Sequence, residues 1–414
     1  MSSNVKNNNF WKKTVTILGA TGSIGCSVID VISKSPDLFD VRVVTAHTNV
    51  AKLVEAAKAL GAQKAVIADE TKKVELESAL AGTDIIIEAG NEAVISAAGE
   101  KVDIVVAAIM GFAGLKPIIA ALEKGTDVAI ANKEPLVAAG EMITALAKET
   151  GANLLPVDSE HNAIFQVFEE RNREQIERLI LTASGGPFLN WDKDKMNAAT
   201  PEQAIAHPTW SMGAKISVDS ATLMNKALEI IEAAHLFSMP ADKIGVVVHP
   251  QSTVHSIVSY KDGSMLSQMG ASDMRTPIAS ALGWPKRLSK GGDILDIASL
   301  TQGNGLTFEN PDTDKFPSIS YAYKCLELGQ GACITLNAAN EVAVSRFLNY
   351  KISFGDIMRC VAYSIDDLYP ELAASGECDK NNLKTVEEIE KLDTIVRQAT
   401  NGFIDTSCEK LKNV

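Results

Sequence analysis

The first part of the chain alternates between short apolar runs and segments of helical periodicity. Residues 14–18 and 41–46 are short runs in which apolar side chains predominate, whereas residues 50–60 place apolar side chains three and four positions apart. Strands that lack polar alternation are typical of a parallel sheet with helices on both faces. Residues 1–155 are therefore predicted to form a Rossmann-like, doubly wound α/β domain. Its further strands are expected at 65–68, 84–87, 104–108, 128–131 and 153–155.

The middle of the chain mixes strands and helices in a less regular order. This mixture indicates a central α+β domain over residues 156–290. A loop is expected at 206–215, where tryptophan and methionine stand among small and polar residues. The strands are expected at 178–183, 244–248, 254–260 and 264–269, and a helix at 222–234.

Glycine-rich turns separate this region from the end of the chain. Gly291-Gly292 and the turn at 302–305 predict a linker over residues 291–315. Beyond it, helical periodicity predicts a C-terminal helical domain over residues 316–414. Its helices are expected at 318–328, 337–348, 353–368 and 385–399.

The charge balance excludes several classes of partner. Lys and Arg number 39 and Asp and Glu 52, which gives a net charge of −13. A general nucleic-acid or membrane-surface binder needs a basic surface, so an anionic ligand would require a local positive potential. No run approaches the roughly 18 apolar residues of a membrane span. The six cysteines are scattered and form no metal or redox motif, which indicates a reducing, cytoplasmic location.

A glycine-rich turn follows the first strand. Gly19, Gly22 and Gly25 are spaced three residues apart between that strand and a helix. Such glycines let the chain turn tightly and let a phosphate approach the free N–H groups at the helix start. A purely structural turn is the alternative, but the strand before and the helix after favour a dinucleotide site.

The end of the second strand bears on the choice of dinucleotide. An acidic residue there usually binds the ribose of NAD, whereas this chain has His47-Thr48-Asn49. Because no carboxylate would repel a 2′-phosphate, the segment favours NADP. The alternative is that His47 simply ends a strand.

Two acidic segments indicate a metal site. Asp158 and Glu160 follow the strand at 153–155, where α/β proteins collect their ligands. Taken alone, Asp158 or Ser159 is expected to cap a helix. Glu229 lies on a later helix, and together the three carboxylates would suit Mg²⁺ or Mn²⁺. The alternative for Glu229 is a solvated helix face with a Lys–Glu pair.

Polar side chains near Glu229 suit a phosphate. Asn225 and Lys226 share its helix face, and Ser220 precedes them. The Ser184-Gly185-Gly186-Pro187 turn is expected to wrap the same phosphate with N–H groups and the Ser184 hydroxyl, and the alternative is a plain turn. The loop with Trp210 is predicted to be a lid that excludes water, although a lone tryptophan is more often core packing.

The chain contains seven long motifs in a fixed order: GATGSIG, ANKEPLV, LLPVDSEHNAIFQ, TASGGPF, HPTWSMGAKISVDSATLMNKALEIIEA, VHPQSTVHSIV and DMRTPIA. In this order they make the chain similar to the 1-deoxy-D-xylulose 5-phosphate reductoisomerase family. The resemblance covers about residues 14–400. It implies an NADPH- and divalent-metal-dependent enzyme that rearranges 1-deoxy-D-xylulose 5-phosphate and reduces it to 2-C-methyl-D-erythritol 4-phosphate. That reaction belongs to the non-mevalonate route to isoprenoid precursors, and the family is typically homodimeric.

The resemblance implies roles for individual residues where the motifs match. NADPH contacts are implied for Thr21, Gly22, Ser23, Ile24, Asn49, Asn132, Glu134 and Gly213, and metal binding for Asp158, Glu160 and Glu229. Substrate contacts are implied for Ser159, Glu160, Ser184, His207, Trp210, Ser220, Asn225, Lys226 and Glu229. Lys133, Glu160 and His207 are the implied catalytic residues. The basic residue that the family often carries before Asn49 is absent here.

Two other functions remain open at the level of sequence. A plain NAD(P)-dependent dehydrogenase would transfer hydride without a metal or a skeletal rearrangement. A semialdehyde-type dehydrogenase would need a placed nucleophilic cysteine, and no cysteine lies in a motif. A non-catalytic NADP-binding regulator would not need three carboxylates beside a phosphate pocket.

Overall fold

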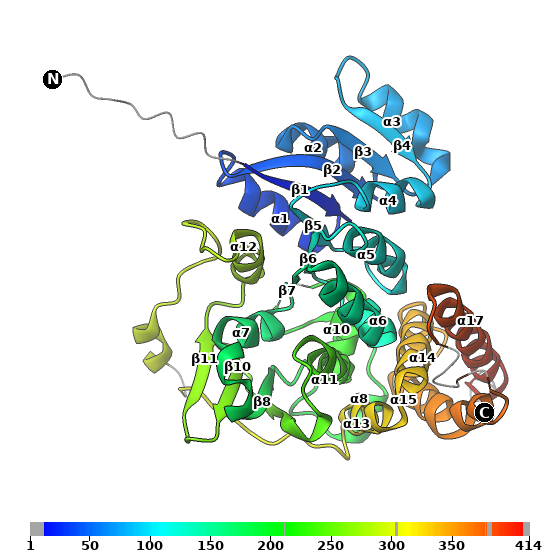
Figure 1. Ribbon diagram of the computed structural model, residues 1–414. Coiled ribbons are helices and arrows are strands. Elements are labelled where there is room, and N and C mark those ends of the chain that lie inside the picture. The colour runs from blue at the N-terminus through cyan, green and yellow to red at the C-terminus, as the bar shows by residue number, and fades with distance from the viewer. Residues whose placement is uncertain (1–11, 211, 303–304, 377, 379–382, 409–414) are drawn as a thin grey trace.

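The structure is a computed structural model that describes residues 12–210, 212–302, 305–376, 378 and 383–408 (Figure 1). Outside these ranges lie Ser211 of the predicted lid, residues 303–304 of the predicted linker, and residues 1–11, 377, 379–382 and 409–414 of the two predicted terminal domains.

The N-terminal part is a seven-stranded parallel sheet in the order β4-β3-β2-β1-β5-β6-β7. Helices cover both of its faces, so the predicted doubly wound fold is confirmed. The strands are β1 (Lys13–Leu18), β2 (Phe39–Ala46), β3 (Lys64–Ile67), β4 (Ile86–Ala89), β5 (Ile104–Ala107), β6 (Asp127–Ile130) and β7 (Leu154–Pro156). The helices are α1 (Ser23–Ser33), α2 (Val50–Leu60), α3 (Lys73–Ala79), α4 (Asn91–Ala98), α5 (Leu115–Leu122) and α6 (Glu134–Thr150).

The strand order reverses between β1 and β5. In open parallel sheets a ligand crevice forms at this switch point, outside the carboxyl ends of the strands. The glycine turn follows β1 and therefore lies at the crevice. The fourth strand begins two residues later than the sequence predicts, at Ile86.

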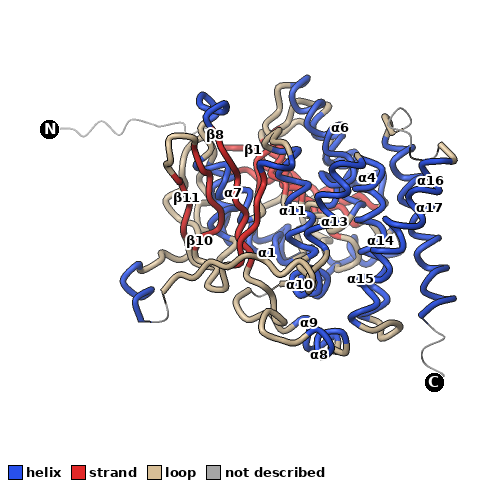
Figure 2. Tube along the Cα trace, turned by 90° about the horizontal axis from the view of Figure 1, so that it is seen from below, coloured by secondary structure: helices blue, strands red, loops and turns tan. Residues whose placement is uncertain are grey.

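The second sheet has four strands in the order β11-β10-β8-β9. β8 is parallel to β9 and antiparallel to β10, and β11 is an edge strand that pairs only with β10 (Figure 2). The strands are β8 (Ile176–Ala183), β9 (Ile244–Val248), β10 (Val254–Tyr260) and β11 (Met265–Met269). The helices of this part are α7 (Ser159–Val167), α8 (Lys193–Asn197), α9 (Pro201–Ile205), α10 (Ala214–Ala221), α11 (Met224–Leu236) and α12 (Arg275–Gly283).

The helix predicted over 222–234 begins differently in the structure. Leu223 has a left-handed backbone, with φ 55°, and separates α10 from α11. The sequence predicted that Ser220 stands at the start of the helix that carries Asn225. In the structure Ser220 instead lies in the last turn of the preceding helix, α10. The predicted loop at 206–215 is also shorter, because α10 begins at Ala214.

The α12 helix leaves the second sheet and packs against α1 of the first (Figure 1). Ile278 and Leu282 of α12 are buried in the core beneath α1 and α2. Lys13 donates to the carbonyl oxygens of Leu282 and Trp284, both at 3.0 Å. The chain then returns to the second sheet, where Glu309 pairs with Val248.

The C-terminal part is helical, as predicted, with helices α13 (Ser318–Leu328), α14 (Gln330–Leu348), α15 (Phe354–Tyr363), α16 (Tyr369–Ala374) and α17 (Val386–Phe403). α14 begins seven residues before the predicted start at residue 337. It is buried along most of its length and packs on α6, α13, α15 and α17. A helix buried on all sides has no polar face, so its periodicity is weak at the sequence level.

Candidate active site

The glycine turn at the switch point requires two residues without side chains. Gly19 has φ 79°, and a Cβ there would lie 2.5 Å from the carbonyl oxygen of Ala108 at the end of β5. A Cβ on Gly25 would lie 2.4 Å from the oxygen of Gly19. The turn therefore packs tightly between two strands and α1, and leaves the helix N-terminus at Gly22 exposed as an anion site.

A cavity of about 530 Å³ extends from this turn to the second sheet. It is bounded by the turn, the ends of β5 and β6, the start of α7, the loop before α10, and the residues before α12. The structure brings most of the predicted site residues to its wall: Gly22, Ser23, Ile24, Asn132, Lys133, Glu134, Asp158, Ser159, Glu160, Ser184, His207, Trp210, Gly213, Ser220, Asn225 and Lys226.

Three predicted residues lie outside that wall. Glu229 is fully buried directly beneath it and contacts the wall residues Lys133 and Lys226. Thr21 is in the glycine turn beside the wall. Asn49 lies beyond the end of β2 and caps α2, where its Oδ1 accepts a hydrogen bond of 3.0 Å from Lys52 N.

Asp158, Glu160 and Glu229 converge as the sequence predicts. One carboxylate oxygen from each lies within 4.8 Å of the others. Asp158 also caps α7, since its Oδ1 accepts from Glu160 N at 3.2 Å. The capping role and the metal-binding role are therefore compatible. Hard oxygen donors in this arrangement fit a divalent cation such as Mg²⁺ or Mn²⁺.

Two ammonium groups hold the carboxylates together. Lys133 Nζ is 2.8 Å from Asp158 Oδ2 and 3.2 Å from Glu229 Oε1. Lys226 Nζ is 2.8 Å from Glu160 Oε1 and also bonds Glu229. Asn225 accepts from Lys133 at 2.7 Å and donates to Glu229 at 2.5 Å. The pair of Lys226 and Glu229 is thus buried and not a solvated helix face.

Glu229 is the carboxylate whose protonation the site controls most closely. Burial raises its pKa to about 7, with further raising by Asp158 and Glu160, while Lys133 and Lys226 act in the opposite direction. The same two ammonium groups help to keep the pKa of Asp158 well below its usual value, against the effect of burial. Near neutral pH a cation can therefore displace the proton of Glu229 at small cost.

His161 and Glu232, which the sequence did not predict, also belong to this buried cluster. His161 Nε2 lies 3.0 Å from Glu229 O, and its Nδ1 lies 3.3 Å from Asp158 Oδ1 and 3.1 Å from Glu232 Oε2. Burial lowers the pKa of His161, but Glu232 and Asp158 outweigh it and hold the pKa well above the usual value. The three-residue spacings of Asp158 to His161 and of Glu229 to Glu232 were the available signal.

The Ser184 turn forms the opposite side of the cavity. Ser184 Oγ lies 2.9 Å from His207 Nε2 and accepts from Gly186 N at 3.2 Å. A Cβ on Gly186 would lie 2.6 Å from Ser220 O, so the turn abuts the end of α10. The hydroxyls of Ser184 and Ser220 therefore face a common space with Asn225 and Lys226.

His207 anchors the loop that carries Trp210. Its Nδ1 accepts from Thr209 N at 3.1 Å and from Trp210 N at 2.9 Å, which leaves Nε2 to donate to Ser184. Burial lowers the pKa of His207, so the neutral ring with this tautomer is favoured. The Trp210 ring is half-buried, with its centroid 6.0 Å from that of His255. His207 and Trp210 of this loop both line the cavity.

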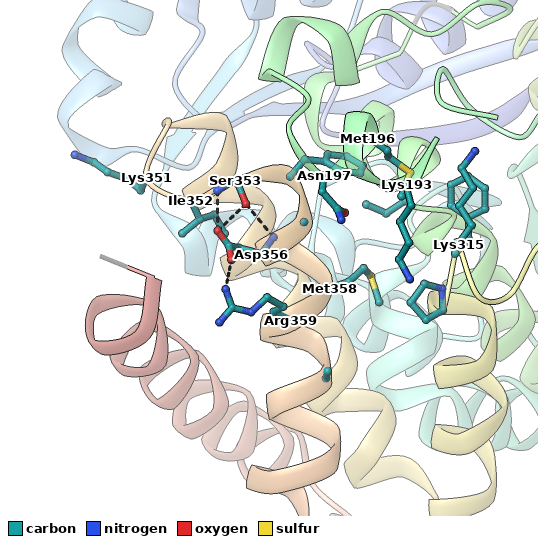
Figure 3. Close-up of a pocket in the computed structure, with 16 residues that line it drawn as sticks. Lys193, Met196, Asn197, Lys315, Lys351, Ile352, Ser353, Asp356, Met358 and Arg359 are labelled. Atoms are coloured by element: carbon teal, nitrogen blue, oxygen red, sulfur yellow. Dashed lines mark hydrogen bonds and ion pairs between the residues drawn. The ribbon is translucent and has the colours of Figure 1, made fainter. Parts of the chain in front are cut away.

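A second cavity, of about 630 Å³, lies between α8, α15 and the start of α13 (Figure 3). Three of its four basic side chains are used in local contacts. Arg359 pairs with Asp356 at 2.6 Å, Lys193 donates to Asp314 O at 3.0 Å, and Lys315 donates to Phe188 O at 2.9 Å. None of the predicted site residues lines it, so the chemistry belongs to the first cavity.

No helix in the described ranges is long and apolar enough to cross a bilayer. The fold and the site define a class of protein: an α/β protein of the dinucleotide-binding type, with a cluster of three carboxylates that could hold a metal ion beside its crevice.

The chain belongs to the 1-deoxy-D-xylulose 5-phosphate reductoisomerase family. The family model of that name matches residues 15–140, and the models of its C-terminal domains match residues 154–237 and 269–399. The family predicted from the sequence motifs is therefore confirmed.

Relatives and solved structures agree with the family models. The reductoisomerase of Rhodospirillum centenum is 52% identical over 356 residues, which are 86% of this chain and 88% of the relative. That of Zymomonas mobilis is 49% identical over 365 residues, 88% of this chain and 93% of the relative. The Zymomonas structure in complex with NADPH matches with a TM-score of 0.85 and 44% identity, over 96% of this chain and 100% of that one. A DOX-P reductoisomerase in complex with NADPH, fosmidomycin and magnesium matches with a TM-score of 0.90 and 42% identity, over 95% and 98%.

Proposed function

We propose that this protein converts 1-deoxy-D-xylulose 5-phosphate into 2-C-methyl-D-erythritol 4-phosphate, using NADPH and a divalent metal, in non-mevalonate isoprenoid precursor biosynthesis. Family membership over most of the chain supports this function. One structural observation carries it: Asp158, Glu160 and Glu229 converge in the cavity that also contains the glycine turn.

The metal ligands are Asp158, Glu160 and Glu229, and the ion is Mg²⁺ or Mn²⁺. When bound, a divalent ion polarises a ketone and acidifies a neighbouring hydroxyl, and NADPH supplies a hydride. The glycine turn suits the cofactor because it leaves the N-terminus of α1, at Gly22, exposed at the cavity wall. The cofactor contacts that we assign are Thr21, Gly22, Ser23, Ile24, Asn49, Asn132, Glu134 and Gly213.

The substrate phosphate is bound by Ser184, Ser220, Asn225 and Lys226. Hydroxyl, amide and ammonium donors are the groups that recognise a phosphate monoester, and Lys226 gives the local positive charge that an acidic chain needs. Ser159, Glu160 and Glu229 contact the sugar part. Because the phosphate is remote from the reacting carbons, its binding energy can hold the substrate in place.

The catalytic residues that we assign are Lys133, Glu160 and His207. Lys133 compensates for the charge of Asp158 and Glu229. Its three N–H groups bond Asp158, Glu229 and Asn225, so it would have to give up one of these bonds to donate a hydrogen bond to a developing oxyanion. Glu160 accepts from Ser159 Oγ at 2.5 Å and pairs with Lys226, so its carboxylate is held at the wall. His207 and Trp210 cover the substrate and exclude water.

Each part of the chain has its own role in the proposed function. Residues 1–155 bind NADPH, and residues 156–290 supply the catalytic site and the lid at 206–215. Residues 291–315 are the linker to residues 316–414, which form the C-terminal helical domain. The protein is cytoplasmic, which the buried thiols of Cys325 and Cys333 and the absence of a paired cysteine motif in the sequence support.

The protein forms a homodimer through the edge strand β11. Edge strands present unpaired backbone groups, and β11 also exposes Met265, Leu266 and Met269. An exposed apolar edge of this kind is stabilised when a second copy covers it.

A single reaction tests the proposed function. The purified protein is supplied with 1-deoxy-D-xylulose 5-phosphate, NADPH and Mg²⁺, and the product is identified by NMR. We expect 2-C-methyl-D-erythritol 4-phosphate with one NADPH oxidised per product. A reduced but unrearranged sugar would instead indicate a plain dehydrogenase, and no oxidation of NADPH would refute the enzymatic function.

A further inference from the structure

A buried polar relay connects the C-terminal helix α14 to the cavity. Asn340 Nδ2 on α14 donates to Asp219 Oδ1 on α10 at 2.8 Å. Asp219 Oδ2 pairs with Lys215 Nζ at 2.8 Å, and the same ammonium pairs with Glu134 Oε1 at 2.7 Å. Glu134 is the first residue of α6, next to Lys133 of the catalytic cluster. The relay therefore runs through all three parts of the chain.

The members of the relay depend on one another because they are out of water. Glu134 is 4%, Asp219 1% and Asn340 0% exposed. Buried carboxylates need a counter-charge or a hydrogen-bond donor, and Lys215 is the ammonium that these two share. Asp219, Glu134 and the nearby Glu341 raise the pKa of Lys215 although burial lowers it, so the ammonium stays charged.

The Asn340 amide affects how the Lys215 ammonium is shared between Asp219 and Glu134. Its amide satisfies one oxygen of Asp219, so that Lys215 only needs to satisfy the other. Without this amide, Asp219 would retain an unpaired oxygen and attract Lys215 more strongly. Glu134 would then lose part of its counter-charge, because its other side-chain contact is a longer one, 3.5 Å from Asn132 Nδ2.

Lys215 also lies at the root of the lid. It is the second residue of α10 and lies two positions after Gly213, the N-cap residue at the end of the loop that carries Trp210. Lys215, Asp219 and Glu134 all line the cavity. A displacement of the ammonium would thus move both the Glu134 carboxylate and the backbone where the lid begins.

We propose that Lys215 is a positioning residue for the dinucleotide, held by Asp219 and by Asn340 of α14 so that it fixes Glu134 and the root of the lid at the cavity wall. This inference rests on the proposed function, which assigns Glu134 and Gly213 to the cofactor. It gives the C-terminal helical part a direct effect on cofactor affinity.

The test measures the dissociation constant for NADPH by fluorescence titration, without substrate or metal, beside the KM values, kcat and the thermal midpoint. Removing a hydrogen bond to a charged group typically costs about tenfold or more in affinity. We expect Lys215→Met to weaken NADPH binding by at least about tenfold, and Asn340→Leu by about three- to tenfold. Lys215→Arg can pair with both carboxylates and should stay within about threefold of the parent.

Thr335→Val is the matched control. Thr335 is a fully buried polar residue of the same helix, but its hydroxyl bonds only Gly331 O within α14. Thr335→Val should lower the thermal midpoint by less than Asn340→Leu, because its bond is to a neutral carbonyl, and it should leave the NADPH dissociation constant within about twofold.

Two outcomes would overturn the relay. One is an Asn340→Leu protein that loses stability, as the control does, but binds NADPH as tightly as the parent. Because the Asn340→Leu protein keeps both ion pairs of Lys215, it still tests the relay if Lys215→Met fails to fold. The other is a folded Lys215→Met protein with unchanged NADPH affinity. A parent protein that does not bind NADPH at all would contradict the proposed function as well, which separates the two failures.

Discussion

Side chains of the site serve two neighbours at once. Asp158 caps α7 and pairs with Lys133. Asn225 accepts a hydrogen bond from Lys133 and donates one to Glu229. Sequence reasoning found the carboxylates because their spacing predicts a shared helix face or strand end. It did not find Lys215, since the partner Glu134 lies 81 positions away in sequence and only the fold brings them together.

The raised pKa of Glu229 makes metal binding depend on pH. In the metal-free protein this carboxyl has a pKa of about 7, so below pH 7 an ion must displace a proton. We expect the Mg²⁺ dissociation constant from calorimetry to rise by up to about tenfold per pH unit below 7 and to be nearly constant above it. Glu229→Gln should bind Mg²⁺ weakly at every pH. A parent protein with a flat pH dependence would contradict the assignment.

The same carboxyl influences stability in the opposite direction to most acidic groups. Its folded-state pKa of about 7 exceeds the ordinary value of 4.5, so the folded protein binds this proton more tightly. Between these values the contribution of Glu229 to stability therefore decreases as the pH rises. The thermal midpoint of the metal-free parent protein, measured relative to that of Glu229→Gln, should therefore fall as the pH rises from 4.5 to about 7. Glu229→Gln has no carboxyl that titrates at this position.

Lys226 tests the phosphate assignment. Lys226→Ala removes a buried ammonium, and we expect the KM for the phosphorylated substrate to rise by about ten- to a hundredfold. The unphosphorylated sugar 1-deoxy-D-xylulose serves as the control substrate, since its KM should change much less. Equal effects on both substrates would show that Lys226 acts through the carboxylates alone.

At the scale of elements, the hydrophobic pattern predicts the strands of both sheets to within a few residues, and likewise the helices expected at 50–60, 318–328, 353–368 and 385–399. It fails where tertiary packing decides. The left-handed Leu223 between α10 and α11 has no glycine or proline signal, and its side chain is only 2% exposed. The start of α14 was missed because residues 331–340 are buried on all sides and show no amphipathic pattern.

Gly25 offers an element-scale test of the cofactor turn. Gly25→Ala would place a Cβ 2.4 Å from Gly19 O, whereas Gly402 of α17 has open space around that position. We expect Gly402→Ala to stabilise the protein by about 0.5–1 kcal/mol, the usual gain for alanine in a helix. Gly25→Ala should lower stability and weaken NADPH binding by at least about tenfold. An unaffected NADPH affinity would mean that the turn does not hold the cofactor.

At the scale of the whole molecule, one core runs from the nucleotide-binding sheet through α6 and α11 into α14. Leu136, Ile230 and Leu336, one from each part, belong to this single cluster. Sequence alone predicts three regions but not their common core, because contacts between distant segments leave no periodic signal. The α12 helix shows the same limit, since it lies in the predicted central region yet packs on α1.

The dimer proposal is tested at this scale. Leu266→Lys would place a charge on the apolar edge of β11, where Leu266 is 38% exposed. We expect sedimentation to show mainly monomer, with a dimer dissociation constant raised by at least about tenfold. Val74→Lys, at a 72% exposed position on α3, is the control and should remain dimeric. A Leu266→Lys protein that stays dimeric would place the interface elsewhere.

The central claim is that side chains from α7 and α11 close around one divalent ion beside the nucleotide crevice. The most direct measurement is anomalous diffraction from crystals grown with Mn²⁺. We expect one strong anomalous peak within bonding distance of carboxylate oxygens of Asp158, Glu160 and Glu229. A strong peak elsewhere, with Lys133 and Lys226 still bonded to these carboxylates, would contradict it.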